Sequence, residues 1–432
     1  MQIKKAFYLA LIFLGIFQAL PQAQTNAPAS TDPATVMLPP ADFHFSEWRQ
    51  QDFLKFDPHY AEELTNRIAR AKLLGKQVIG REMAGQNTEL SHQILIEILW
   101  LISATADFKQ LDQRLDDLQA SLDHPEREAQ AEEENPADGS WGAGCTQWFC
   151  TLRASYDHLE DAKYELHFID RINSPKKLTN YFNSISVSDI ARTGIDNGNE
   201  FNESLSDLMR MILRHDPKQY AYDPKLKATM TDLIMNQLRD PATGYWGERY
   251  VHNGQTQFVD DVSDTFHVVS YLSGDVPDMD KIIATTLAAQ DLEFPAGNLY
   301  KGKRYDHLNV DVAELFRLGW PHASDAQKKG IAAELHKLLQ FCLTESLQPD
   351  GSFKMWVGDF SKEESTYYGA SFLARIGYFD KSKRFWTDED FPDAENVRQK
   401  IIAYILNHQK TGATGGVYYK SALKHLEYEP SP

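Results

Sequence analysis

The stretch Pro241-Ala242-Thr243-Gly244-Tyr245-Trp246 carries the pattern that decides the fold of this chain. A turn is followed by a glycine, and an aromatic residue comes two positions later. Related stretches contain Asp138-Gly139-Ser140-Trp141 and Asp350-Gly351-Ser352-Phe353. Glycines in turn-like settings recur 50 to 64 residues apart, at Gly85, Gly139, Gly194, Gly244, Gly297, Gly351 and Gly415. A spacing of this size predicts a repeat architecture.

Apolar residues between the glycines recur at helical spacing. Two sets show this, Ile331, Leu335, Leu338, Leu339 and Cys342, and then Val259, Val262, Phe266 and Val269. Each repeat therefore predicts two antiparallel helices joined by a turn, where glycine adopts positive φ at no steric cost. Because one amphipathic pair cannot bury its apolar face alone, the pairs must stack. We predict an all-α fold, an α/α toroid that forms an incomplete or closed ring of about six or seven helical hairpins.

The first residues have the plan of a secretory signal peptide. Lys4 and Lys5 precede an apolar run that ends near the small residue Ala23, so we assign residues 1–23 to the signal. Residues 24–42 are rich in Pro, Thr, Ala and Ser and predict a disordered lead-in. The remaining residues, 43–432, form one predicted toroid domain. We expect a secreted or periplasmic monomer without a membrane anchor once the signal is removed.

Composition narrows the choice of partners. The formal net charge of −18 argues against nucleic acid and anionic membranes. No zinc spacing and no glycine-rich phosphate loop occurs, so we predict neither a metal nor a cofactor. The cysteines Cys145 and Cys150 can form a disulfide if the chain bends at Gly144, whereas on a continuous helix they diverge.

A ring of hairpins brings residues that are distant in sequence to a shared centre, and the segments after the glycines are rich in aromatic and hydrogen-bonding side chains. This mixture suits sugars, whose C–H faces stack on rings while their hydroxyls need polar partners. The candidate substrate-binding residues are Trp246, Arg249, Tyr250, His252, Lys303, Trp356 and Tyr367. We therefore predict an anionic polysaccharide or oligosaccharide as the partner.

The turn pattern is similar to that of the α/α-toroid proteins, and the chain resembles the toroid polysaccharide lyases, in particular the glucuronan lyase type. The resemblance implies β-elimination at a uronate: an Asn or His, helped by an Arg, neutralises the carboxylate, and a Tyr transfers protons. Neutralisation matters because a charged carboxylate resists a second negative charge at C5. Carried over, these roles fall to Asn199, His267 (or His252), Arg304 and Tyr305.

Two other functions stay open at this stage. One is a glycoside hydrolase that uses a pair of carboxyl groups. Its candidates are Glu200, Glu248, Asp261, Asp264 and Glu363. The other is a toroid without catalytic activity that binds a glycan or a protein. A lyase product absorbs ultraviolet light and a hydrolase product does not, so the first two are readily distinguished.

Overall fold

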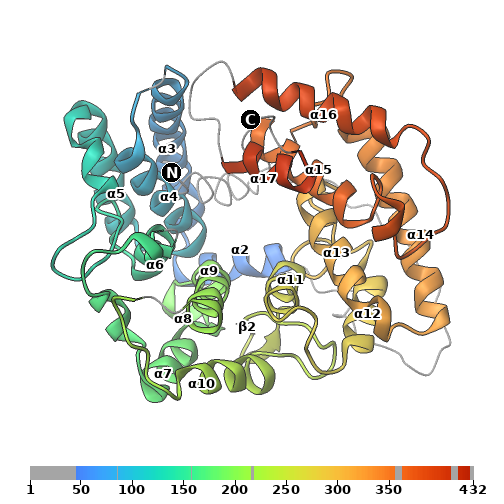
Figure 1. Ribbon diagram of the computed structural model, residues 1–432. Helices are drawn as coiled ribbons and strands as arrows, with labels where there is room; N and C mark the ends of the chain where they lie inside the picture. Colours follow the sequence, from blue (N-terminus) through green and yellow to red (C-terminus); the bar gives the residue numbers. More distant parts are fainter. Residues whose placement is uncertain are drawn as a thin grey trace.

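The computed structural model describes residues 45–84, 86–156, 158–215, 218–355, 362–409 and 417–428. This part of the chain is mostly helical and contains one small sheet of three strands (Figure 1). The predicted signal peptide and lead-in, together with Gly85, Trp356 and Gly415, lie outside the described residues. None of the described helices combines the length and apolar character that crossing a bilayer requires.

Two series of helices alternate along the chain after α3 (Tyr60–Met83). The first series consists of α4 (Glu89–Ala104), α6 (Trp148–Tyr156), α9 (Gly198–Met209), α11 (Val262–Tyr271), α13 (Asp306–Gly319), α15 (Lys362–Arg375) and α17 (Val417–His425). The second consists of α5 (Phe108–Asp123), α7 (Pro175–Ile185), α10 (Leu226–Asp232), α12 (Met279–Ala289), α14 (Asp325–Phe341) and α16 (Ala394–Gln409). In Figure 1 the first series lies nearer the middle of the molecule than the second.

Neighbouring helices of the first series pack on one another. Helix α9 contacts both α6 and α11, and the contacts continue through α13 and α15 to α17. Members of the second series pack behind, for example α12 against α13 and α14. Residues from distant repeats are therefore brought onto adjacent helices of the first series. A π-helical segment, Arg210–Arg214, extends α9 by one turn.

The glycine turns behave largely as predicted. Gly139, Gly194, Gly244 and Gly351 have positive φ, between 67° and 90°. Gly297 has a different reason to be glycine, because a Cβ there would lie 2.3 Å from the carbonyl oxygen of Ala289. Each of these five glycines precedes a helix of the first series. The turn pattern thus marks where the chain returns to the middle of the molecule.

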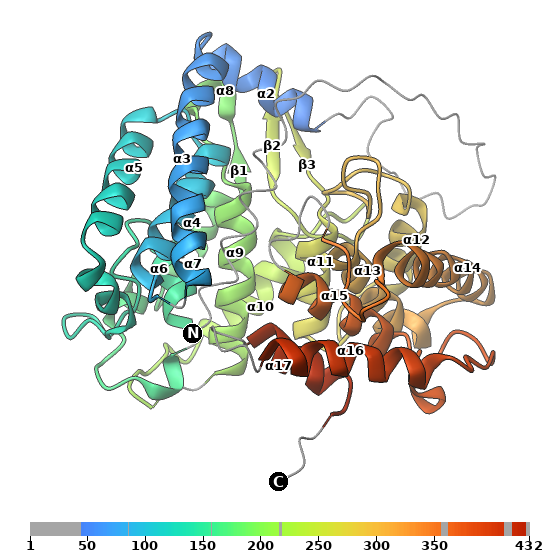
Figure 2. The same ribbon diagram turned by 90° about the horizontal axis from the view of Figure 1, so that it is seen from above.

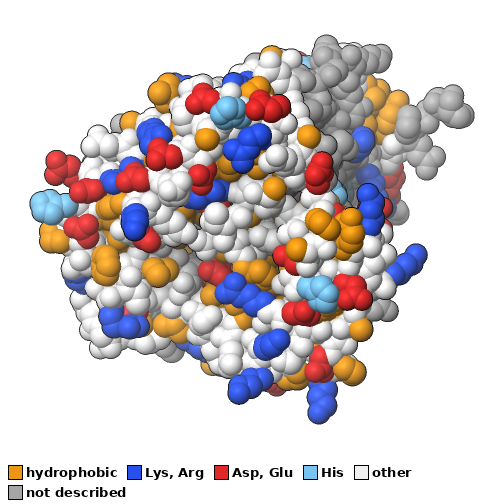
Figure 3. Space-filling model, turned by 90° about the vertical axis from the view of Figure 1, so that its left-hand side faces the viewer, with side chains coloured by type: hydrophobic (Ala, Val, Ile, Leu, Met, Phe, Trp, Pro, Cys, Tyr) orange, Lys and Arg blue, Asp and Glu red, His pale blue; other side chains and the backbone are white. Residues whose placement is uncertain are grey.

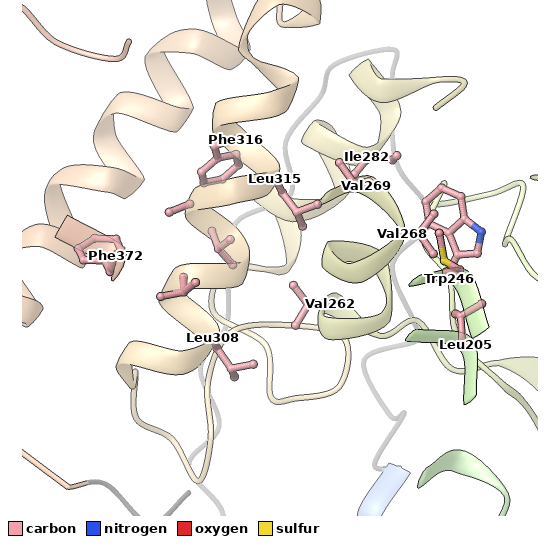
Figure 4. Close-up of a cluster of buried hydrophobic side chains, with 14 of the residues drawn as sticks. Leu205, Trp246, Val262, Val268, Val269, Ile282, Leu308, Leu315, Phe316 and Phe372 are labelled. Carbon is pink, nitrogen blue, oxygen red and sulfur yellow. The ribbon is translucent and has the colours of Figure 1, made fainter. Parts of the chain in front are cut away.

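The residues that follow the turns anchor the core. Trp246 and Phe353, two positions after Gly244 and Gly351, are both 0% exposed. Figure 4 shows Trp246 among Val268, Leu205 and the other apolar side chains that join these helices. At about 25 cal/mol per Å² of buried apolar surface, a large aromatic side chain in this position contributes several kcal/mol.

The helical pattern did not predict a small sheet, but the mostly helical structure is consistent with the all-α expectation. Strands β1 (Val187–Ser188) and β2 (Arg249–His252) pair in parallel, and β2 pairs with β3 (Gln255–Phe258) in antiparallel register. Helix α2 (Phe45–Phe56) lies at the same end of the molecule, beside α8 (Ile190–Thr193) (Figure 2). A helix of the N-terminal part therefore covers the end at which the sheet lies.

The open question about the cysteines is answered by a disulfide between Cys145 and Cys150. It forms because the chain bends before α6, so that only Cys150 is helical. Buried Glu97 fixes this bend, since its carboxylate accepts hydrogen bonds from the backbone N–H groups of Thr146 and Gln147. The third cysteine, Cys342, is buried and free.

Candidate functional site

The predicted catalytic residues are not all brought together. Asn199, on the first turn of α9, donates a hydrogen bond of 2.7 Å to the hydroxyl of Ser103 and so ties α9 to α4. The Arg304 guanidinium pairs with Asp291 at 2.9 Å and with buried Glu334, on α14, at 3.1 Å. Both side chains are held by other groups of the protein. The placement of Asn199 and Arg304 therefore does not support contact with a substrate.

Tyr305 and His267 belong to neighbouring elements, the start of α13 and α11. The Tyr305 ring, 5% exposed at the start of α13, is 5.8 Å from the ring of His307. The charge of His307 in turn acts on the pKa of His267. Of the four predicted residues, His267 has the surroundings that most suggest chemistry.

The predicted substrate-binding residues divide into core, covered and accessible side chains. Trp246 and Tyr250 are both 0% exposed, so neither presents a face to a substrate, which corrects their predicted role. The Trp246 indole donates to the Ile234 carbonyl at 2.7 Å. Arg249 donates to the Gln237 carbonyl at 2.6 Å.

Helix α2 covers His252 and Tyr250 together. The His252 ring stacks on Trp48 with centroids 4.3 Å apart, and its Nδ1 lies 2.8 Å from the Asp52 carboxylate. Tyr250 donates its hydroxyl to the same carboxylate. These hydrogen bonds, with one from Lys55, outweigh the effect of burial and hold the pKa of Asp52 below its usual value. His252 is thus held by Asp52 and Trp48 at the α2–sheet end of the molecule.

Two of the predicted binding residues remain accessible. Lys303 is exposed on a turn before α13. Tyr367, on α15, is half-buried and lies among other rings: its centroid is 5.1 Å from that of Tyr368 and 5.3 Å from that of Tyr418. The prediction for Trp356 falls outside the described residues.

The surroundings of His267, on α11, shift its pKa strongly. Its side chain is half-buried, and its Nδ1 has no hydrogen-bond partner in the described part of the chain. Burial, reinforced by the positive charges of Arg153 and Arg210, lowers the pKa of His267 to about 3. The imidazole is therefore neutral at physiological pH and retains a lone pair that can accept a proton.

The two arginines come from neighbouring elements. Arg153 on α6 lies 3.1 Å from the carboxylates of both Glu203 and Asp207, which project from α9. Arg210 stands at the end of α9, with its guanidinium 3.8 Å from the ring centre of Tyr156. Burial raises the pKa of Glu203. Arg210 lies 3.8 Å from the Asp207 carboxylate, so the two arginines share this carboxylate. The group has the donors that a carboxylate ligand requires.

Tyr271 completes this group one turn beyond His267. The two ring centres are 5.4 Å apart, and the Tyr271 hydroxyl is 3.2 Å from the hydroxyl of Ser206. Burial raises the pKa of Tyr271, so the phenol is protonated and can donate. We call Arg153, Arg210, His267 and Tyr271 the α6–α11 group. It combines a proton acceptor, a proton donor and two anion binders.

A set of buried carboxyl groups lies toward the start of α11. Asp261 caps the helix by accepting from the N–H groups of Ser263 and Asp264, and burial raises the pKa of Asp261 to about 7. Asp264 accepts a hydrogen bond from Asn202 and is 3% exposed. Burial also raises its pKa well above the usual value, as it does for Asp311 on α13, which is 1% exposed. Asp264 and Asp311 are therefore too enclosed to contact a polymer directly.

A surface depression between α3 and α5 offers less chemistry. It is lined by His59, Glu62, Glu63, Asn66, Arg67, Arg70 and Asp112. Arg67 makes two hydrogen bonds to Asp112, of 2.8 and 2.7 Å, so the charges satisfy one another. Figure 3 shows this side of the molecule, where charged side chains of both signs are interspersed. Within the described ranges, no group of three or more His, Cys, Asp or Glu side chains could hold a metal ion.

Comparison of the sequence with protein-family models and with curated proteins gives no match. Function must therefore be argued from the site. Sequence reasoning found His267 but missed Arg153, Arg210 and Tyr271. The signal was helical spacing: Tyr271 is four residues after His267, and Arg210 is seven after Glu203, so each pair shares a helix face.

Proposed function

We propose that the two helix series form an α/α toroid and that the protein is a secreted polysaccharide lyase, cleaving a uronate-containing glycan by β-elimination at the α6–α11 group. One observation carries the proposal: a neutral, half-buried imidazole with an unbonded nitrogen stands near two arginines and beside a protonated tyrosine. Leaving a buried polar nitrogen without a partner costs about 1–3 kcal/mol, which a purely structural histidine would avoid.

In this mechanism the uronate carboxylate binds Arg210 and Arg153, which offsets its charge and makes the C5 proton more acidic. His267 takes the C5 proton, and the electron pair left on C5 forms the C4–C5 double bond. The C4–O bond breaks, and the leaving oxygen takes a proton from Tyr271. Proton transfer from the imidazolium to the tyrosine then restores both groups. The change from the earlier assignment is that Arg153, Arg210 and Tyr271 replace Asn199, Arg304 and Tyr305.

The low pKa of free His267 also has a role in this mechanism. Positive neighbours disfavour the imidazolium, so an anion bound to the arginines raises the pKa of His267 and makes it a better base. Only a substrate that carries a carboxylate therefore activates the group. A neutral glycan leaves the imidazole a weak base.

The decisive test uses the full-length protein with glucuronan, alginate, pectate and glycosaminoglycans. We expect ultraviolet absorbance from unsaturated ends on at least one polymer, and its loss in Arg210→Gln. Arg192→Gln is the matched control because the Arg192 side chain is 75% exposed and, among the described residues, pairs with Asp189 alone. Absorbance that persists in Arg210→Gln would remove the α6–α11 group from the mechanism.

A glycoside hydrolase is the second candidate, favoured by the half-buried Asp261 with its pKa of about 7. A carboxyl group that titrates there can act as a general acid near neutral pH. Reducing ends that increase on a neutral glycan without ultraviolet absorbance, and that disappear in Asp261→Asn, would favour this function over the lyase.

A further inference from the structure

A second group of side chains, from α13, α15 and α17, is built mainly from rings. We call it the α13–α17 ring cluster, and it consists of His307, Tyr367, Tyr368, Tyr418 and His425. His307 and Tyr368 stack with centroids 4.1 Å apart and planes 10° apart. Three consecutive helices of the first series therefore contribute to one aromatic surface.

Tyr367 is the ring that can receive a ligand. Its neighbours Tyr368, Tyr418 and His425 are tilted against it by 59°, 51° and 48°, so none of these rings lies flat on its face. The Tyr367 side chain is half-buried, as are Tyr368 and His425. A half-exposed aromatic face held in place by surrounding rings is the usual platform for the C–H face of a sugar.

The charges around the ring cluster differ from those around His267. Glu364 lies near enough to Tyr368 for its negative charge to raise the pKa of Tyr368 further, after the larger effect of burial. Arg375 pairs with Glu314 through its Nε at 3.3 Å, while its Nη1 is buried and has no hydrogen-bond partner among the described residues. Glu364 is 3% exposed, so it does not contact a sugar directly, but its negative charge disfavours a second carboxylate nearby.

The two histidines of the cluster add no positive charge that would attract an anion. Burial lowers the pKa of His307 to about 4 and that of His425 to about 4, so both rings are neutral at physiological pH. His307 also lies between the two regions, because it is on α13, which packs against α11, and a charge on it would act on His267. Adjacent units of one glycan chain can thus lie on both groups.

We propose that the α13–α17 ring cluster binds an uncharged pyranose unit, stacked on Tyr367, next to the uronate held by Arg153 and Arg210. This inference rests on the proposed function for the position of the uronate. It specifies the substrate class as a heteropolymer in which uronate units neighbour uncharged sugars, N-acetylated amino sugars included. A homopolymer of uronate would place a second carboxylate near the negative charge of Glu364.

Saturation-transfer NMR on the full-length protein tests the ring cluster without requiring cleavage. The probes are neutral trisaccharides of gluco, galacto, manno and N-acetylglucosamine configuration, with a uronate trisaccharide for comparison. At least one neutral probe is expected to bind through its C–H protons. Binding is expected to persist in Tyr367→Phe and His267→Gln and to fall at least fivefold in Tyr367→Ala. Tyr367→Leu keeps apolar volume but lacks the ring. If Tyr367→Ala folds poorly, Tyr367→Leu takes its place and is expected to show the same loss of binding.

The outcomes separate this inference from the proposed function. Failure of every neutral probe to bind, or equal binding to Tyr367→Leu and the parent, overturns the ring cluster as a sugar site. Tighter binding of the uronate trisaccharide that depends on Tyr367 overturns its preference for an uncharged sugar. Neutral binding that depends on Tyr367, in a protein that releases no unsaturated ends from any polymer, supports the ring cluster and overturns only the lyase.

Discussion

Two histidines with similar depth in the molecule, His252 and His267, have opposite surroundings. His252 lies under α2, stacked on Trp48 and 2.8 Å from the carboxylate of Asp52. His267 has an Nδ1 without a partner in the described residues and is near the positive charges of Arg153 and Arg210. Both are polar groups taken out of water, but only the first has its desolvation offset.

The difference separates groups that stabilise the fold from groups that cost stability. At the α2–sheet end, the Tyr250 hydroxyl and Nδ1 of His252 both bond to the Asp52 carboxylate. On the α9–α11 face, the desolvation of His267 and Asp264 is not fully compensated, as their shifted pKa values indicate. Evolution retains such groups where they bind or react, so the uncompensated face is the better candidate for function.

The largest expected effect comes from removing the unpartnered imidazole. His267→Gln is expected to lower kcat for β-elimination by about 10³-fold, within the range typical of general bases. The initial rate of ultraviolet absorbance per mole of folded protein measures this. The variant is expected to fold and to be more stable than the parent at pH 5. Between pH 6.5 and about 3, the His267 imidazole of the parent binds a proton in the unfolded state but not in the folded state, which destabilises the fold.

His252→Gln is the matched control for this comparison. It is expected to keep cleavage within a few-fold of the parent while losing stability, because it breaks the contact with Asp52. If His252→Gln abolished cleavage and His267→Gln did not, the roles assigned to the two histidines would be reversed.

The next effect concerns the stabilising network. Asp52→Ala is expected to lower the free energy of unfolding by about 3 kcal/mol, since Tyr250, His252 and Lys55 all lose their acceptor. Denaturant titration at pH 7 measures it. The pKa of Asp52 is lowered in the fold, so its stabilisation is present above the unfolded pKa and is lost as pH falls through the folded one. A difference that grew toward acid pH would contradict this account.

The fold was more predictable than the site, and particular residues show why. Gly244 and Gly351, each followed by a buried aromatic residue, mark turns that any chain of this local pattern must make. The sheet escaped prediction because its strands are two to four residues long and pair with partners distant in sequence. A short strand has too few residues to show an alternating pattern.

The site was harder to predict because the sequence does not show which side chains contact one another in the fold. Arg304 and His252 are residues of the types found in a lyase site. In the fold, however, Arg304 pairs with Glu334 and His252 pairs with Asp52. Arg153 and Arg210 became candidates only when α6, α9 and α11 were seen to pack together. Helical spacing along α9 and α11 was the one local signal that pointed to Arg210 and Tyr271.

Substitution of Asp261 is expected to have a smaller effect on stability. Asp261 stabilises the fold by capping α11, but its pKa is raised to about 7, as is typical of the uncompensated α9–α11 face. Asp261→Asn retains a capping oxygen and cannot ionise. The folded parent keeps its proton above the unfolded pKa, so its stability falls as pH rises from about 4 to about 7. We therefore expect the variant to gain about 1–2 kcal/mol over the parent between these limits, measured by denaturant titration at pH 4.5 and pH 8. A gain that is independent of pH would show that Asp261 does not titrate in this window.

The smallest effect is expected from Asn199, which resembles His252 in having a partner. Its amide donates to Ser103 across the contact between α9 and α4, and an ordinary hydrogen bond of this kind contributes about 1 kcal/mol. Asn199→Ala is expected to lose about that much stability and to keep cleavage within about twofold, measured by denaturant titration and by the ultraviolet assay. A loss of cleavage above 100-fold with unchanged stability would return Asn199 to the role of neutralising amide. In that case, a hydrogen-bond partner within the fold would not exclude a side chain from catalysis in this protein.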